Sequence, residues 1–162
     1  MTNTELINQF YASFAKKDIE GMLACYHPLI EFEDPAFGKL EGKRAGDMWR
    51  MLLSNDKSEL EITFSDVQAD DNTGSANWTA DYSLGQTGRK VHNVISARFE
   101  FKDKRIYRHR DDFNLHKWAK QALGMSGFLF GWTAFFKRKL QKRANQNLDY
   151  FIQKEAAKSN RM

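Results

Sequence analysis

The chain has 162 residues, of which 41% are hydrophobic, 28% charged and 14% aromatic. This length suits a single domain with a sizeable core, and the composition excludes a disordered or collagen-like chain. A single cysteine, Cys25, excludes an internal disulfide framework and fits a reducing compartment. The first ten residues lack the basic and apolar regions of a secretory signal. We therefore expect a cytoplasmic protein.

Charge is distributed unevenly along the chain. Residues 115–162 hold 10 of the 25 Lys and Arg residues but only 2 of the 21 Asp and Glu residues, so a basic tail follows a mildly acidic body. A nucleic-acid-binding protein more often carries a basic face across its whole fold, so we expect no nucleic-acid partner. The four histidines and Cys25 show no metal-ligand spacing. We expect neither a metal nor a cofactor.

Two helices are expected at the start of the chain. Thr2 and Glu5 have the spacing of a capping box and precede apolar residues at helical intervals. Asp18 is typical of an N-cap and predicts a second, shorter helix with Tyr26 on its inner face. That helix should end before Pro28, because the residue that precedes a proline disfavours the α conformation.

The next segment mixes a short strand over 29–33, irregular chain around Gly38 and Gly42, and a third helix over 43–53. From residue 60 onward apolar residues recur at every second position, with turn-forming residues between the runs. The strands expected from this pattern cover 60–64, 76–84, 93–101 and 106–113.

Three helices followed by hairpin-linked strands predict an α+β fold, in which the helices pack on one side of a curved antiparallel sheet. Such a sheet tends to enclose a pocket on its concave face. Aromatic residues at strand spacing are candidates for the pocket wall, although such stripes are also typical of an ordinary core. The candidate ligand-binding residues are Phe10, Trp49, Trp78, Tyr82, Asn93 and Phe99.

Two stretches of sequence and the hairpins that follow them resemble the superfamily of nuclear transport factor 2, ketosteroid isomerases and SnoaL-like polyketide cyclases. The stretches are DIEGM at 18–22 and FEDPAFG at 32–38. The resemblance covers about residues 3–118 and implies a cone-shaped fold with a deep, mostly apolar cavity, often in a homodimer. The segment RHRDDFNL at 108–115 and Trp118 are similar to an uncharacterised bacterial branch of SnoaL-like proteins. We therefore expect a SnoaL-like domain over 1–118 and a helical extension over 119–162.

Asp34 is the leading candidate for a catalytic residue. By the resemblance it lies at the position of the general base of ketosteroid isomerases, in the motif Glu33-Asp34-Pro35. A carboxylate in an apolar pocket has a raised pKa and can move a proton between carbons beside a ketone. The alternative is that Asp34 and Pro35 only initiate a turn.

The same resemblance argues against steroid isomerisation. It places Phe10 and Ala97 where those isomerases have the tyrosine and the protonated aspartate of their oxyanion hole. Tyr11 is one residue away from the required position and is expected to point about 100° from it on a helix. Loss of an oxyanion donor costs about two to three orders of magnitude in rate.

His109 and Asp111 are the next candidates. They are two residues apart on the last expected strand and so share one face, which by the resemblance lines the cavity. We expect them to assist Asp34 as acid and orienting group. Asp111 also resembles the position of one acid in limonene epoxide hydrolases, although the Arg and Asp partners of those enzymes are not evident. The alternative is that Asp111 pairs with Arg108 or Arg110 on the surface, or caps the following helix.

The C-terminal extension begins with an uncharged stretch over 123–136, which is too short to span a bilayer. A basic helix follows, with an apolar stripe that includes Leu140, Leu148 and Ile152. Three roles remain open. The extension could contact a membrane surface through 123–152, or it could form a lid over the cavity. It could also be a helix packed on the protein's own body or on a second copy. We favour the last.

These features predict a SnoaL-like protein that binds a small apolar molecule, cyclic or a ketone, in an aromatic cavity. As an enzyme it would perform cofactor-free isomerisation, cyclisation or hydration, with Asn93 as a further hydrogen-bond donor. The alternative is a non-catalytic carrier or dimerisation module whose tail contacts lipid or a partner. Catalysis requires that Asp34 and Asp111 converge with a raised carboxyl pKa, whereas a carrier would turn both acids to solvent.

Overall fold

A computed structural model of the chain describes residues 1–55, 59–85 and 87–162. Its helices are α1 (Asn3–Ala15), α2 (Ile19–Ala24), α3 (Lys43–Leu53), α4 (Leu115–Leu123), α5 (Met125–Phe130) and α6 (Ala134–Ser159). Its strands are β1 (Tyr26–Asp34), β2 (Gly38–Glu41), β3 (Glu61–Ala69), β4 (Thr73–Ser83), β5 (Lys90–Lys102) and β6 (Arg105–Asp112).

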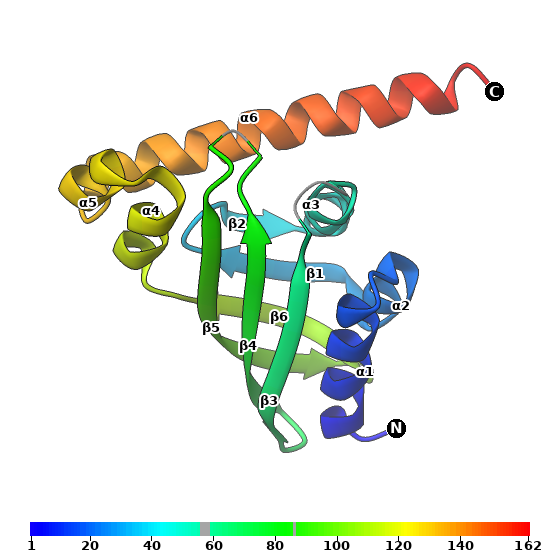
Figure 1. Cartoon of the computed structure of the whole chain (residues 1–162). Helices are drawn as coiled ribbons and strands as arrows, with labels where there is room; N and C mark the ends of the chain where they lie inside the picture. Colours follow the sequence, from blue (N-terminus) through cyan, green and yellow to red (C-terminus); the bar gives the residue numbers. More distant parts are fainter. Residues whose placement is uncertain (56–58, 86) are drawn as a thin grey trace.

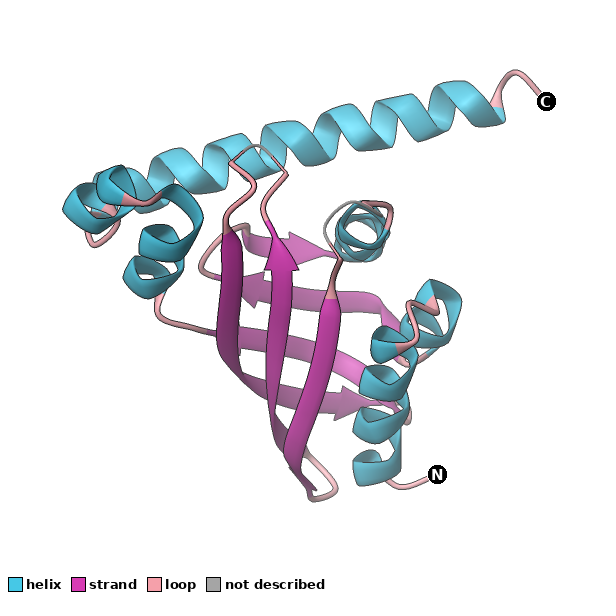
Figure 2. Cartoon of the chain, viewed as in Figure 1, coloured by secondary structure: helices cyan, strands magenta, loops and turns pink. Residues whose placement is uncertain are grey.

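The six strands form one sheet in the order β2-β1-β6-β5-β4-β3. Neighbours are antiparallel except β1 and β6, which run parallel, so the sheet is mixed. The sheet bends strongly, so that β3, β4 and β5 run across β1, β2 and β6, and α1, α2 and α3 lie along one side (Figure 1). The predicted α+β fold with a curved sheet and three N-terminal helices is confirmed (Figure 2).

The helix caps predicted from the sequence are present. Thr2 accepts a hydrogen bond from the backbone N–H of Glu5, whose carboxylate accepts one in return from the N–H of Thr2. The Asp18 carboxylate accepts the N–H of Gly21 at the start of α2. The caps satisfy N–H groups that have no partner within a helix.

Two predictions for the segment after α2 are wrong. Tyr26 is not helical; it is the first residue of β1 and pairs with Ile106 of β6. The chain around Gly38 is not irregular but forms β2, because Gly38 adopts a positive φ of 73° and pairs with Asp34 across a tight turn. Proline breaks a helix but is tolerated in a strand at an irregularity, and the register of β1 on β6 shifts between Tyr26 and Glu31.

Side chains alternate between the inside of the cone and solvent, as the period of two predicts. On β5, Ile95, Ala97 and Phe99 are buried, whereas Arg98 and Glu100 are exposed. The inward side chains meet those of α1, α2 and α3 and form the hydrophobic core. This alternation also determines which polar residues of the sheet face inward.

The long helix α6 packs on the rest of the chain and crosses above the turn between β1 and β2 (Figure 1). Gln141 donates to the carbonyl oxygen of Pro35 at 3.2 Å, and Asn145 donates to that of Phe37 at 2.9 Å. Arg44 of α3 forms an ion pair with Asp149 at 2.6 Å. These contacts place α6 on the turn that carries Asp34. In the part of the chain that the structure describes, no helix is long and apolar enough to cross a membrane.

The attachment of α6 depends on Leu148, whose side chain is fully buried. We expect Leu148→Ala to lower the free energy of unfolding by about 2–4 kcal/mol, because it leaves a cavity between α6 and the core. Urea unfolding measures this change. Tyr150→Ala, at an exposed position of the same helix, should change stability by less than about 0.5 kcal/mol. Equal effects would show that α6 does not depend on this contact.

Candidate functional site

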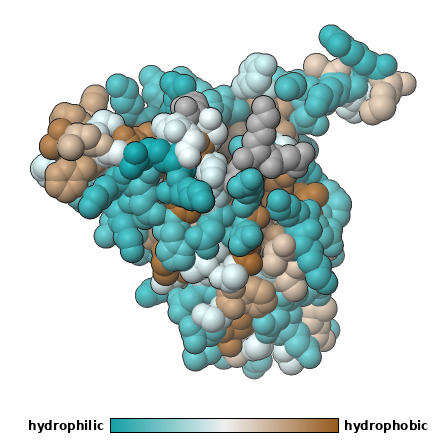
Figure 3. Space-filling model, in the orientation of Figure 1, coloured by the Kyte–Doolittle hydropathy of each residue, from teal (hydrophilic) through white to brown (hydrophobic). Residues whose placement is uncertain are grey.

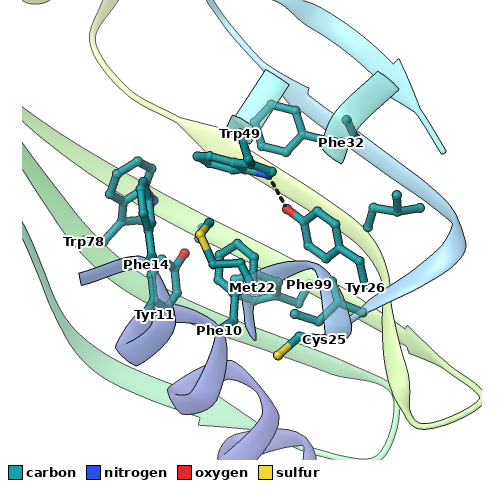
Figure 4. Close-up of a cluster of buried hydrophobic side chains, with 14 of the residues drawn as sticks. Phe10, Tyr11, Phe14, Met22, Cys25, Tyr26, Phe32, Trp49, Trp78 and Phe99 are labelled. Atoms are coloured by element: carbon teal, nitrogen blue, oxygen red, sulfur yellow. Dashed lines mark hydrogen bonds between the residues drawn. The ribbon is translucent and has the colours of Figure 1, made fainter. Parts of the chain in front are cut away.

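The inside of the cone holds a chain of hydrogen bonds that links α3 to three strands. Trp49 Nε1 donates to Tyr26 Oη at 3.0 Å. Tyr26 Oη lies 2.7 Å from His109 Nδ1, and His109 Nε2 lies 2.9 Å from Asp111 Oδ1. Trp78 Nε1 donates to the same carboxylate oxygen at 3.2 Å. Figure 4 shows the bond from Trp49 to Tyr26 among the surrounding aromatic rings.

One proton arrangement satisfies every group in this chain. The Tyr26 hydroxyl accepts from Trp49 and so donates its own hydrogen to His109 Nδ1. A neutral His109 then carries its proton on Nε2 and donates it to Asp111. All donors therefore point toward one carboxylate, which carries the single charge. Buried polar groups are costly unless they are paired in this way.

His109 and Asp111 both face inward, with relative exposures of only 1% and 4%. The ring of His109 lies among aromatic rings, 4.6 Å from Phe99 and 5.2 Å from Phe32 between centroids. The alternative that Asp111 pairs with an arginine on the surface is therefore wrong. Asp112, the next residue on β6, is the exposed one.

Tyr11 also faces the interior, contrary to the expectation that it points away. Its ring stacks on Phe64 of β3 at 5.4 Å, while Phe10 stacks on Tyr26 of β1 at 5.2 Å. Helix α1 therefore buries two adjacent positions, because different strands of the bent sheet lie on two of its sides. Within the described residues the Tyr11 hydroxyl is buried without a hydrogen-bond partner, and burial followed by the charge of Asp111 raises its pKa.

Asp34 ends β1 and is partly buried. Its Oδ1 accepts the N–H groups of Ala36 at 3.0 Å and Phe37 at 2.6 Å, so it does hold the turn, as the alternative reading of Asp34-Pro35 predicts. Its Oδ2 accepts no hydrogen bond from a described residue. Burial, helped by the charges of Asp111 and Glu33, raises the pKa of Asp34 to about 7, against the two N–H bonds that lower it. A carboxyl with this pKa can both take and return a proton near neutral pH.

Tyr82 of β4 lies close enough to Asp34 for the two groups to affect each other electrostatically. Its hydroxyl accepts a hydrogen bond of 2.7 Å from Trp118 Nε1 of α4. Burial raises the pKa of Tyr82, and the charge of Asp34 adds to that rise. The tyrosine stays protonated, and its own hydrogen makes no hydrogen bond to a described residue. Tyr82 is therefore a donor that is free to bind an oxygen of a ligand.

The candidate ligand-binding residues separate into two groups. Phe10, Trp49 and Phe99 are at most 2% exposed, so water does not reach them. The ring of Phe10 packs against the rings of Trp49 and His109. They form core in this structure rather than the wall of an open cavity. Tyr82 and Asn93 are partly buried, and Trp78 keeps 8% of its surface exposed. Asp34, Tyr82 and Asn93 are each partly buried, so part of every one of these side chains reaches solvent. We call this group of three residues the mouth.

Two residues of this arrangement are missed by the sequence reasoning. Tyr26 is assigned to a helix there and has no polar role, although the inward side of a strand that begins at residue 26 would have indicated it. Trp118 is noted only for its resemblance to related proteins. Trp118 and Tyr82 are 36 positions apart in the sequence, so no local pattern indicates their contact.

A large groove lies on the opposite, outer face of the sheet. It has a volume of about 1130 Å³ and is lined mainly by polar and charged side chains, among them Glu31, Glu33, Arg98 and Arg108. Arg108 bridges Glu31 at 3.2 Å and Glu100 at 3.0 Å across three strands. Because its lining is mainly polar and charged, this face does not match the apolar ligand expected from the sequence.

Comparison with known proteins now assigns a family. A family model described as a SnoaL-like domain matches residues 7–109. The chain belongs to the SnoaL-like domain family. No curated protein sequence matches this SnoaL-like protein at a significant level.

Similar folds occur among solved structures. An LEH-like epoxide hydrolase of M. tuberculosis has a TM-score of 0.62 and 20% identity, over 78% of this chain and 93% of that chain. An NTF2-like protein of unknown function from Burkholderia pseudomallei has a TM-score of 0.63 and 14% identity, over 76% of this chain and 99% of that chain. TerC, co-crystallised with polyporic acid, has a TM-score of 0.58 and 21% identity, over 69% of this chain and 91% of that chain. At these identities the likeness shows that the fold is shared.

The raised pKa of Asp34 predicts a specific pH dependence of stability. Folded Asp34 keeps its proton up to a pKa of about 7, whereas the unfolded chain releases it near pH 4. The native state therefore binds more protons in between, and stability falls as pH rises through this window. Asp34→Asn removes this loss, so its stability relative to the natural protein should increase by about 4 kcal/mol between pH 4 and pH 8. Urea unfolding across this range tests the prediction. Glu61→Gln, at an exposed position of β3, should show no such trend.

The hydrogen-bond chain predicts a large cost for removing its acceptor. Asp111→Ala leaves Trp78 Nε1 and His109 Nε2 buried without a partner. We expect a loss of about 3–5 kcal/mol in the free energy of unfolding. Asp112→Ala, at the adjacent exposed position, should cost less than about 0.5 kcal/mol. Chemical denaturation measures both, and a small effect of Asp111→Ala would contradict the charge assignment.

Proposed function

We propose that this SnoaL-like protein binds a small apolar ketone or cyclic compound at the mouth and moves a proton on it without a cofactor. The observation that carries the proposal is the pairing of two groups there. Asp34 has a pKa of about 7 and an unused Oδ2, and Tyr82 has a free hydroxyl hydrogen. A base and a hydrogen-bond donor are the two groups that enolisation of a ketone requires.

The reaction follows from these two groups. The ionised Asp34 takes a proton from a carbon beside the carbonyl, and the electron pair of that C–H bond moves onto the carbonyl oxygen. The Tyr82 hydroxyl donates a hydrogen bond to this oxygen as its negative charge develops. Return of the proton from Asp34 to a different carbon isomerises the compound. Attack of the enolate carbon on a second carbonyl of the same molecule instead closes a ring.

Other residues have supporting roles in this proposal. The charge of Asp111 disfavours ionisation of Asp34 and so helps to keep its pKa near neutrality. His109 holds the Asp111 carboxylate in place and does not touch the ligand. Tyr82 replaces the oxyanion donors of ketosteroid isomerases, because Phe10 and Ala97 at those positions have no side-chain group that can donate a hydrogen bond. Asn93, at the mouth, is a second donor.

The family supports binding of a small molecule, and TerC was crystallised with one. The choice of a ketone rests on the two groups at the mouth alone. The expected homodimer and the cytoplasmic location stay predictions.

The first test identifies a ligand by native mass spectrometry of the purified protein and extraction of any bound compound. Exchange of its carbon-bound hydrogen in D₂O, followed by NMR, then measures proton abstraction directly. The rate should rise with pH and level off above an apparent pKa near 7, because the ionised form of Asp34 is the base.

Variants assign this reaction to the proposed groups. Asp34→Asn and Tyr82→Phe should each slow the exchange by about 100-fold or more. Glu61→Gln, which removes an exposed charge on β3, should leave it unchanged. If Asp34→Asn binds the compound and exchanges it at the natural rate, the catalytic proposal is wrong. If the natural protein binds the compound but never exchanges it, the protein is a carrier.

A further inference from the structure

The corner of the molecule formed by α5 and the start of α6 exposes an unusual number of large apolar side chains. We call this corner the apolar knob. It comprises Met125, Phe128, Leu129, Phe130, Trp132 and Phe135, which are between 48% and 72% exposed. The knob protrudes from the body at the end opposite the C-terminus (Figure 1), and apolar surface gathers there in the space-filling view (Figure 3). Soluble proteins rarely expose such a cluster without a binding role.

The outward direction of these side chains follows from the way α5 is attached. Gly127 is buried against Ala119 of α4, so closely that a Cβ at Gly127 would overlap the carbonyl group of Ala119. Gly131, one turn later, meets the methyl group of the same alanine. The glycine side of α5 thus faces the protein, and Phe128, Leu129 and Phe130 are left facing solvent. The knob is therefore a consequence of packing and not a frayed end.

Basic side chains surround the knob. Lys120 Nζ lies 5.5 Å from the centre of the Phe128 ring, and Lys139 Nζ lies 5.7 Å from that of Phe135. Lys117, Lys137 and Arg138 are exposed nearby in sequence. No acidic residue occurs in the sequence between Asp112 and Asp149. The surface therefore combines apolar and positively charged side chains, and residues 113–148, which form it, include no acidic residue.

From this combination we infer that the apolar knob docks on a membrane surface rich in anionic lipid. Aromatic and aliphatic side chains enter the boundary between headgroups and acyl chains, while lysine and arginine side chains meet the lipid phosphates and carboxylates. The rest of the chain favours one orientation, because residues 1–114 carry more acidic than basic residues and are repelled by the same surface. This inference does not depend on the proposed catalytic function.

The experiment uses the full chain and sedimentation with lipid vesicles. One set contains phosphatidylcholine alone, and the other contains equal parts of phosphatidylcholine and phosphatidylserine. We expect binding to the anionic vesicles to be about ten-fold tighter or more, and to weaken as salt is raised. Trp132 is the most exposed tryptophan of the chain, so its fluorescence should shift to shorter wavelength on binding. Trp132→Phe should bind nearly as well without that shift.

Variants of the knob separate docking from general adhesion. Phe130→Ser with Leu129→Ser should weaken binding to anionic vesicles by about ten-fold per residue. Lys137→Glu with Lys139→Glu should weaken it by a similar amount and remove the preference for phosphatidylserine. Leu29→Ser, at an exposed apolar position on β1, is the matched control and should bind as the natural protein does. All these positions are exposed, so circular dichroism should show an unchanged fold.

Three results would overturn the inference. The first is equal binding to both kinds of vesicle, and the second is equal loss in Leu29→Ser and in the knob variants. The third is failure to bind vesicles together with a dimer, seen by size-exclusion chromatography, that the knob variants convert to monomer. That result would assign the knob to a second copy of the chain. None of these results bears on proton exchange at Asp34, so the two proposals fail separately.

Discussion

The buried carboxylate of Asp111 is the group on which the rest of the interior depends. A charge removed from water is stable only when donors surround it, and here the donors come from distant parts of the chain. Trp78 of β4 and His109 of β6 contact it directly, while Tyr26 of β1 and Trp49 of α3 hold His109 in its tautomer. One charge thus joins α3 and three strands in a fixed arrangement. An apolar core of the same size would not specify these relative positions so narrowly.

The same charge also acts on the mouth. It raises the pKa of Asp34, and Asp34 in turn raises that of Tyr82. Asp34, whose pKa lies near neutrality, and Tyr82, which stays protonated, therefore influence each other electrostatically. The turn that carries Asp34 is clamped by α6 through Gln141 and Asn145. The C-terminal extension thus supports the site directly, in addition to any role of its exposed end.

Local patterns in the sequence predict much of this structure, and long-range contacts explain what they do not predict. Period-two alternation puts His109 and Asp111 on one face, and the family resemblance correctly turns that face inward. The apolar stripe of the last helix correctly includes the buried Leu148. Tyr26 is misassigned because His27-Pro28 reads as the end of a helix, whereas the decisive contact is with β6. Tyr11 is misjudged because a single buried face is assumed for α1. The filling of the interior by aromatic rings depends on the bend of the sheet, which no local pattern encodes.

The parallel pairing of β1 with β6 has a consequence for how the chain reaches its native state. Tyr26 and His109 are 83 residues apart, so β1 and β2 cannot join the sheet until nearly the whole SnoaL-like domain has left the ribosome. Contacts between residues so distant in sequence close slowly, whereas the hairpins of β3, β4, β5 and β6 need only short loops. We therefore expect the β3–β6 hairpins to assemble first, and β1 and β2 to dock on them last. We therefore expect Asp34, which lies at the end of β1, to take its place in the final step of folding.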